Sequence, residues 1–316
     1  GACRAGNIYN LLQRVLYRMV EQGQLEYAQI PVISLNLMGE EKHTGFRITP
    51  SLLSGGIAAG CYGDLIMCLY QQVKPYEQNP GETDRIRSQV EKKLCESIRR
   101  HRNGRHTREK NYRYACEVFS KVPVKPGKKK RVGITGEIYM KYSKLGNDDI
   151  ESFLLRQGME PYSGGFVNYC LYLVDTERYK AEKYQHNPIM AKACAFVLHR
   201  LCEAQKHLLT VIGETDRFQT DLPFPELKEK VQGILAEGCN TGDGWLIAAE
   251  VIQYVEKGCG SVLILHPFGC LVSHVCERGI LQRLHARFPD VSIQTIEYDY
   301  DQSKTLRESR ILLAIS

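Results

Sequence analysis

The first residue whose type and position suggest chemistry is Cys270. An apolar run, 261–265, ends in the turn 266–269, and Cys270 stands where a long amphipathic pattern reaching Phe288 begins. This pattern predicts a buried strand, a tight turn and a helix. Because helix amino termini stabilise negative charge and favour thiolates, Cys270 is predicted to be a metal or cluster ligand or a reactive thiol. The alternative is a small buried core residue.

Two glycine-rich loops are the other candidates. The loop 133–137 ends a predicted strand, and the loop 237–245 opens a predicted helix and holds the single Trp of the chain. Glycines let backbone N–H groups approach an anion, although neither loop matches the P-loop or the dinucleotide-binding pattern. Helix capping alone would explain each loop taken singly. The residues predicted to contact a cofactor are Gly133, Gly136, Glu137, Asn240, Gly242 and Gly244.

Three polar side chains near these loops each leave two interpretations open. His274 follows Cys270 by one helical turn, and His266 precedes it in the turn. Either would serve as a ligand, yet a histidine on an apolar helix is more often a satisfied core residue. Glu137 is predicted to be a general base or a helix-capping partner.

The cysteine count and the charge restrict the class of protein. Twelve cysteines contain no CxxC pair, which argues against zinc ribbons and thioredoxin-type sites. No signal-peptide pattern and no apolar run near the length of a membrane helix is recognised, so a cytoplasmic protein with mostly reduced thiols and no membrane partner is expected. The net charge of +6 is attributed to the basic run 121–131, which is typical of a solvated linker, and no nucleic-acid partner is expected.

The elements that must position these loops alternate between strands and helices after residue 129. Strands are predicted at 131–139, 159–162, 261–265 and 291–298, and helices at 147–157, 166–179, 188–212, 224–236, 242–257, 271–288 and 303–315. Parallel strands with right-handed crossovers predict a Rossmann-like, doubly wound α/β domain over 129–316 with a large helical insertion. The three loops would meet at the carboxyl edge of its sheet.

The preceding part, 1–128, reads as a mostly helical, partial α/β lobe. Helices are predicted at 51–73, 82–100 and 107–121, together with a helix near the start of the chain. The segment 27–37 is the only good strand candidate in this part. Because one strand does not make a parallel sheet, we expect this lobe to be completed by sequence upstream.

Six ordered motifs resemble the carboxyl-terminal part of large acyl-CoA dehydratase activase-related proteins. The motifs are CRAGNIY at 3–9, PVISLN at 31–36, VKPYE at 73–77, VGITGEIY at 132–139, NTGDGW at 240–245 and PFGC at 267–270. In that family, ATPase modules drive a low-potential electron into iron–sulfur clusters. A region similar to the 2-hydroxyacyl-CoA dehydratase subunit follows, with a cluster held by cysteines between Rossmann-like lobes.

This resemblance implies metal ligands and partners. Cys3 and Cys270 stand at the cysteines of the family motifs, and Cys239 is a further candidate in a loop where the family commonly has another residue. Two cysteines do not complete a four-thiolate site, so other ligands would come from upstream sequence, a second subunit, Cys170 or Cys239. The cofactor that the resemblance implies is an iron–sulfur cluster of the 4Fe–4S type. The implied partners are activase ATPase modules and a second copy of the chain, with no ATP site in these residues.

Three functions follow as alternatives. The first is an iron–sulfur module that takes part in ATP-driven electron transfer to a CoA thioester or similar acceptor. The second is a scaffold for the ATPase modules that lacks a complete cluster of its own. The third is a hydrolase or transferase with Cys270 as nucleophile, for which the spacing identifies no His and Asp partners.

Overall fold

The computed structural model describes residues 2–24, 26, 32, 49–299 and 301–316. For residues 2–7 and Tyr9 it describes the backbone alone. The chain divides into two compact units, Gly1–Pro50 and Ser51–Ser316, and each is described by itself. In the first unit, helix α1 spans Ala2–Glu21. The strand predicted at 27–37 lies outside the described residues, apart from residue 32.

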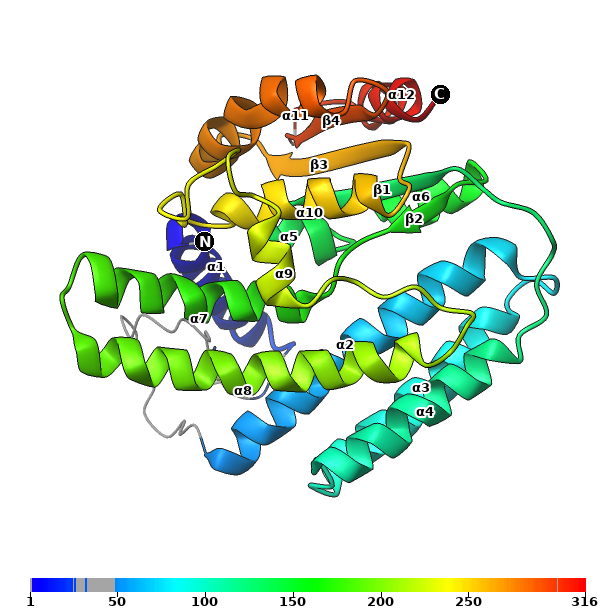
Figure 1. Ribbon diagram of the computed structural model, residues 1–316, viewed down its shortest axis with the longest axis horizontal. Helices are drawn as coiled ribbons and strands as arrows, with labels where there is room; N and C mark the ends of the chain where they lie inside the picture. Colours follow the sequence, from blue (N-terminus) through cyan, green and yellow to red (C-terminus); the bar gives the residue numbers. More distant parts are fainter. Residues whose placement is uncertain (1, 25, 27–31, 33–48, 300) are drawn as a thin grey trace. The chain divides into compact units, whose positions relative to one another are not determined.

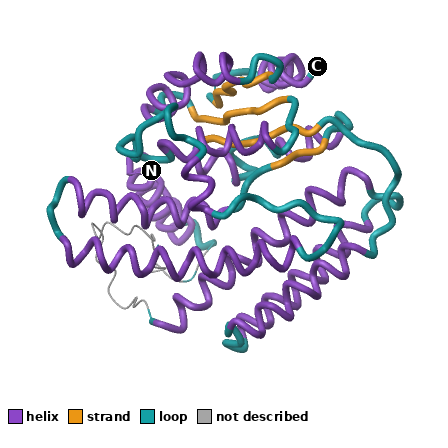
Figure 2. The backbone as a smooth tube through the Cα atoms, viewed as in Figure 1, coloured by secondary structure: helices purple, strands orange, loops and turns teal. Residues whose placement is uncertain are grey.

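The second unit is built on a four-stranded parallel sheet (Figures 1 and 2). Its strands are β1 (Arg131–Gly136), β2 (Glu160–Tyr162), β3 (Ser261–Pro267) and β4 (Ser292–Tyr298), in the order β2-β1-β3-β4. All three strand pairs are parallel. The predicted α/β class with a parallel sheet is therefore confirmed.

Helices cover both faces of the sheet because the central strand β3 is apolar on both sides. Val262 and Ile264 belong to one hydrophobic cluster, and Leu263 and Leu265 belong to the other. This alternation follows from the two-residue period of a strand. The first cluster includes α10 (Gly244–Glu256). The second includes α5 (Ile138–Tyr142), α6 (Ile150–Arg156) and α12 (Lys304–Ile315).

The remaining helices form a layer that shares the first cluster with the sheet. They are α2 (Pro50–Val73), the short η1 (Lys74–Tyr76), α3 (Glu82–Arg99), α4 (Arg105–Ser120), α7 (Phe166–Lys183), α8 (Pro188–Gly213) and α9 (Phe224–Glu229). Asn187 caps α8 by accepting a hydrogen bond from the backbone N–H of Met190. This cluster runs from Ala58 to Ile293. Helices on both sides of residue 128 thus share one core, and the division into 1–128 and 129–316 stays a prediction.

Three predicted elements need correction. The strand predicted at 131–139 ends at Gly136, since Glu137 begins a helix. The helix predicted at 224–236 ends at Glu229. The continuous helix predicted at 271–288 is instead interrupted by a π-helix, η2 (Ser273–Glu277), and a 3₁₀ turn, η3 (Arg278–Ile280), before α11 (Leu281–Arg287). The apolar pattern did not reveal this break because π-helices shift which residues face inward.

The expectation that no apolar run approaches the length of a membrane helix also needs correction, while the absence of a membrane partner stays a prediction. The helical segment Pro50–Tyr76 is long and apolar enough to cross a membrane by length and composition. Its face with Tyr62, Leu65 and Leu69 is nevertheless buried in the main hydrophobic cluster. Core helices pass the same test of length and composition, so this feature alone does not assign a membrane span.

Candidate functional site

The three predicted loops meet at the carboxyl ends of β1 and β3. The backbone N–H of Glu137 donates to the carbonyl oxygen of Leu265 at 2.9 Å, which joins the first loop to β3. The second loop packs on the segment after Cys270, because a Cβ on Gly242 would lie 2.9 Å from Val272 Cγ2. The backbone N–H of Ile138 also lies at the carboxyl group of Asp243. The site therefore joins the loop 133–137 to two loops that lie 100 or more residues later in the sequence.

The glycines of these loops have clear packing roles. A Cβ on Gly133 would lie 2.7 Å from the ring of Tyr254, so this position lets α10 approach β1 closely. Gly136 lies against the backbone of Leu265, and Gly244 against the carbonyl of Cys239. Close packing thus accounts for the glycines without a ligand, and their predicted contact with a cofactor stays a prediction.

Glu137 caps a helix. Its carboxylate accepts hydrogen bonds from the backbone N–H groups of Tyr139 and Met140, at 3.1 and 3.2 Å, at the start of α5. This is the capping role that the sequence left open beside a general-base role. The carboxyl group is half-buried and also contributes negative charge to the neighbouring loop.

Two of the predicted metal ligands lie near a third cysteine that sequence reasoning did not single out. Cys239 and Cys270 are half-buried, and both lie within electrostatic range of the buried Cys276. Burial, and then the charges of Cys239, Glu277 and Cys270, raises the pKa of Cys276 to about 11. In a regular helix, a residue six positions after Cys270 would not lie on the same side as Cys270, so the sequence pattern does not single out Cys276. In the structure, the π-helix η2 places Cys276 on the buried side.

The other two candidate ligands are not brought to this group by the described residues. Cys3 belongs to α1 by its backbone, and its side chain lies outside what the structure describes. Cys170 instead lies near Asp64 and Cys61, and burial raises its pKa to about 11. Among the side chains that the structure describes, no three His, Cys, Asp or Glu residues are placed to hold a metal ion.

Buried acids lie beside the cysteines. Glu277 and Asp243 are only 1% and 6% exposed. Burial, and to a smaller extent the charges of Asp243 and Glu137, raise the pKa of Glu277 to about 8. Burial likewise raises the pKa of Asp243 to about 7, with Glu137 as the next cause. Near neutral pH, these two groups therefore bind protons that an exposed carboxylate would have lost.

Several polar atoms around these acids have no hydrogen-bond partner among the described residues. They are both carboxyl oxygens of Glu277, Oγ of Ser273 and Nδ2 of Asn240. Ser273 is near enough to lower the pKa of Glu277, yet the two side chains are not in hydrogen-bonding geometry. Burying such groups without partners is unfavourable, so they point to a bound water or ligand at this place.

The two histidines occupy different environments. His266 is fully buried and its pKa is lowered by burial, so it is neutral at pH 7. Its ring lies 5.7 Å from that of His274. His274 is exposed, and its Nδ1 is 2.8 Å from the carbonyl oxygen of Cys270. His274 thus lies beside Cys270, but it contacts the backbone of that residue.

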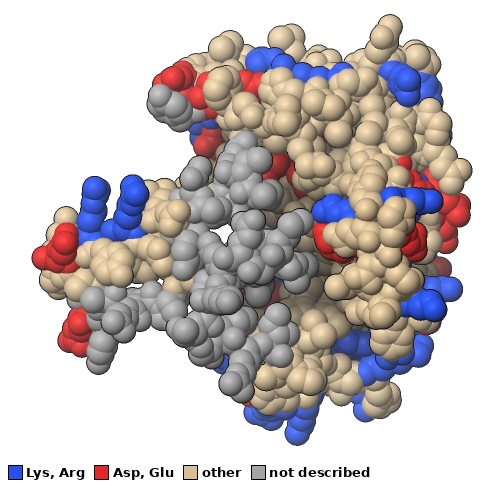
Figure 3. Space-filling view, turned by 90° about the vertical axis from the view of Figure 1, so that its left-hand side faces the viewer, with Lys and Arg blue, Asp and Glu red and all other residues tan. Residues whose placement is uncertain are grey.

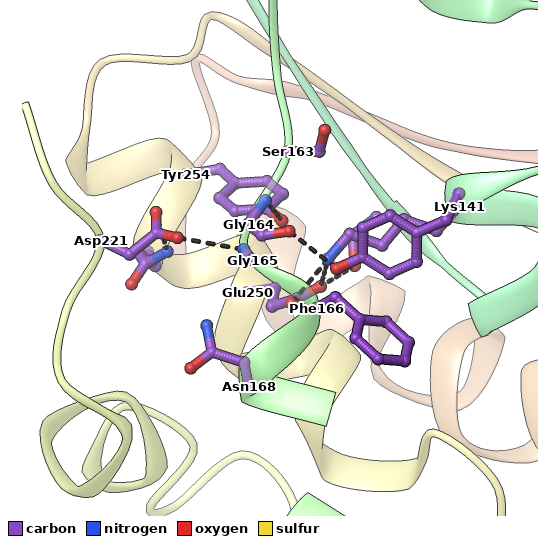
Figure 4. A network of polar contacts seen from close by, with 12 residues as sticks. Lys141, Ser163, Gly164, Gly165, Phe166, Asn168, Asp221, Glu250 and Tyr254 are labelled. Carbon is purple, nitrogen blue, oxygen red and sulfur yellow. Dashed lines mark hydrogen bonds and ion pairs between the residues drawn. The ribbon is translucent and has the colours of Figure 1, made fainter. Parts of the chain in front are cut away.

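A second polar cluster at the ends of β1 and β2 escaped sequence reasoning (Figure 4). Lys141 Nζ lies 2.7 and 2.8 Å from the two carboxyl oxygens of Glu250, and both side chains are 3% exposed. Thr135 Oγ1 donates a further hydrogen bond to Glu250 at 2.5 Å. This buried ion pair connects α5 to α10 beneath the carboxyl end of β1.

The neighbouring turn, 163–165, is held by side chains from three other segments. The N–H of Gly164 donates to the hydroxyl of Tyr254 at 2.6 Å, and the N–H of Gly165 donates to Asp221 at 3.1 Å. Asp64 of α2 accepts hydrogen bonds from the first N–H groups of α7, and burial raises its pKa to about 7. Since these groups are all paired, we assign this cluster a structural role.

No family model, curated protein or solved structure matches the chain. The functional assignment therefore depends on the residues and their geometry.

Proposed function

We propose that this chain is an iron–sulfur cluster-binding module of a 2-hydroxyacyl-CoA dehydratase and activase type of system. Cys270 and Cys239 would be ligands, with Cys3 as a further one. The observation that supports this proposal is the gathering of Cys239, Cys270 and Cys276 where two glycine-rich loops meet the carboxyl end of β3. The strand order β2-β1-β3-β4 and the helices on both sides fit a Rossmann-like, doubly wound sheet.

The donor set fits such a cluster only in part. Thiolates are the ligands that iron–sulfur clusters prefer, and N–H groups of glycine loops stabilise their negative charge. The described side chains do not complete a metal site, so the remaining ligands would come from Cys3, a second subunit or upstream sequence. A bound cluster would supply one-electron transfer to a CoA thioester or similar acceptor.

The two buried acids, Asp243 and Glu277, affect how well an anionic cluster would be accommodated here. Asp243 and Glu277 as carboxylates would repel an anionic cluster, whereas their raised pKa values leave Glu277 mostly and Asp243 partly protonated near pH 7. In this proposal the two acids contribute less negative charge beside the cluster than two exposed carboxylates would. The system would be cytoplasmic, with activase ATPase modules as partners and a homodimer as one assembly that could complete the ligand set.

A scaffold without its own cluster is the second candidate function. It is favoured by the lack, among described side chains, of three residues placed to hold a metal ion. In that case the cysteines near Cys270 would be reduced core thiols.

Anaerobic reconstitution separates the two functions. The chain would be incubated with iron and sulfide, desalted, and analysed for bound iron, bound sulfide and visible absorption. Cys270→Ala and Cys3→Ala are expected to remove most of the absorption, and Cys239→Ala to weaken or remove it. The matched control is Cys95→Ala, an exposed cysteine of α3. A folded wild-type chain without iron would mean either that upstream sequence supplies essential ligands or that the chain is a scaffold, which the same assay on the longer protein would decide. Equal loss in the control would mean that the iron is bound unspecifically, which contradicts the cluster.

A further inference from the structure

The turn between α3 and α4 is a second strongly basic stretch, beside the run 121–131. Residues 99–110 contain six Lys and Arg and one Glu, in a chain whose net charge is +6. This stretch is separate from the basic run 121–131. Five of the six cations are exposed, and we call them the basic tip. They are Arg99, Arg100, Arg102, Arg105 and Lys110.

Nearby acids do little to neutralise the basic tip. Glu109, the single acid of the stretch, contacts Arg113 at 3.0 Å and His207 at 3.4 Å. Arg100 pairs with Glu96, but both side chains are exposed, and such pairs are weak. For the other four cations the described residues provide no ion pair. Figure 3 shows Lys and Arg side chains at the lower end of the molecule, at the height where Figure 1 places the α3–α4 turn.

The turn that carries these cations is held in one conformation. The backbone N–H of Arg102 donates to the carbonyl oxygen of Ser97 at 3.0 Å, and Ser97 Oγ donates to the carbonyl oxygen of Arg102 at 2.9 Å. Asn111 then donates to Ser97 Oγ at 3.1 Å, and Asn103 is buried beneath the turn. A partner would therefore not have to order this backbone on binding.

The start of α4 adds to the positive potential. Its cap is Gly104, which offers no side-chain acceptor to the first N–H groups, and the first turn contains no acid. Arg105 and His106 occupy that turn instead. Positive side chains at a helix amino terminus oppose the usual preference, because the helix dipole is positive there. An anion close to this end would relieve the repulsion.

We propose that the basic tip binds the phosphate backbone of double-stranded nucleic acid without sequence preference. Four of its five cations are arginines, which bind phosphate oxygens in pairs of hydrogen bonds. A helical hairpin end is convex and complements a groove bordered by phosphates. The stretch 99–110 contains no Phe, Tyr or Trp to stack on unpaired bases, which disfavours single strands.

An anionic membrane is the competing partner. Ser51 Oγ lies 3.0 Å from His101 Nδ1, so the start of α2, where Leu53 is 58% exposed, adjoins the turn. Exposed leucine beside basic residues is also a feature of proteins that bind membrane surfaces. The stretch itself has no large apolar side chain, which is why we favour nucleic acid.

The test measures binding of the chain to a labelled 20-base-pair DNA duplex by fluorescence anisotropy, at several salt concentrations from 50 to 200 mM. The tip variant is Arg99→Gln/Arg102→Gln/Arg105→Gln. The control, Lys121→Gln/Lys125→Gln/Lys128→Gln, removes the same charge from exposed residues of the other basic run. Circular dichroism melting accompanies both variants. Because all six side chains are exposed, folding is expected to be retained.

The tip variant is expected to bind at least tenfold more weakly at 50 mM salt. If each arginine contacts one phosphate, the slope of log K against log salt becomes shallower by about 2.7, at about 0.9 per contact. Arg99→Lys/Arg102→Lys/Arg105→Lys should keep most of the slope, because it keeps the charge. The control variant should bind within about twofold of the wild type.

Three outcomes would overturn the proposal. The proposal is refuted directly if the wild-type chain does not bind the duplex at 50 mM salt. Equal weakening in the tip and control variants would mean that diffuse charge, and not the tip, is responsible. Binding to vesicles with anionic lipids that depends on the tip, without comparable duplex binding, would assign the surface to a membrane.

Discussion

Replacing Lys141 by Met would leave the carboxylate of Glu250 buried without its cation. Both side chains are 3% exposed, and Lys141 Nζ contacts both carboxyl oxygens. Breaking a buried ion pair by removing one partner costs about 3–5 kcal/mol. The hydrogen bond from Thr135 remains, which places the expected loss of unfolding free energy near the lower end, about 3 kcal/mol. That is a large share of the about 5–15 kcal/mol typical of a folded protein.

The assay is urea unfolding of the chain followed by circular dichroism. Lys141→Met/Glu250→Gln should lose no more than about 2 kcal/mol, because it removes the uncompensated charge and keeps an acceptor for Thr135. The control is Lys144→Met, whose ion pair with Asp149 is exposed and worth less than about 1 kcal/mol. The reasoning fails if Lys141→Met costs less than about 1 kcal/mol, or if the double variant is no more stable than the single one.

Two further predictions concern pH and packing. Asp64, Asp243 and Glu277 have pKa values raised to about 7, 7 and 8, so the folded state holds protons that the unfolded state has lost. This contribution to stability is full below about pH 4 and is lost as pH rises to about 8, at no more than about 1.4 kcal/mol per pH unit for each group. Urea unfolding at pH 5, 6, 7 and 8 should show this decline, and Asp64→Asn should reduce it; a rise in stability over this range would contradict the assignment. Separately, Gly133→Ala should cost about 1–3 kcal/mol, because the added Cβ would lie 2.7 Å from a tyrosine ring. The control is Gly63→Ala, which has nothing within 4 Å of the added Cβ and should be neutral or stabilising. Thermal melts followed by circular dichroism would compare the two variants with the wild type.

Local patterns were sufficient to predict most of the elements of the sheet. Four apolar residues, 262–265, follow one another without a break, as expected for a strand covered on both faces, and β3 is buried over all seven residues. Asn187 followed by Pro188 marks the start of α8 correctly, because capping and the fixed φ of proline are local effects. The prediction that the loops 133–137 and 237–245 lie near the carboxyl end of β3 is also confirmed, since carboxyl ends of parallel strands share one edge.

The buried polar groups could not be predicted in the same way. Lys141 and Glu250 are 109 residues apart, and Asp64 caps α7 from a distance of 102 residues. Nothing in the local sequence of a charged residue says which distant group will pair with it. The break in the helix after Cys270 was hidden for a related reason. A π-helix is stabilised by what its side chains contact, and here it turns Ser273, Cys276 and Glu277 inward.

That break also sets the electrostatics of the candidate site. A regular helix from Cys270 would repeat every 3.6 residues, whereas η2 buries Cys276 and Glu277 side by side. A buried cysteine and a buried carboxylic acid with other acidic groups nearby both favour their neutral forms, and the pKa values of Cys276 and Glu277 are raised accordingly. A metal centre would reverse this preference for the thiol, because a coordinated cysteine is deprotonated. Cluster binding at this place would therefore release protons from the coordinating thiols.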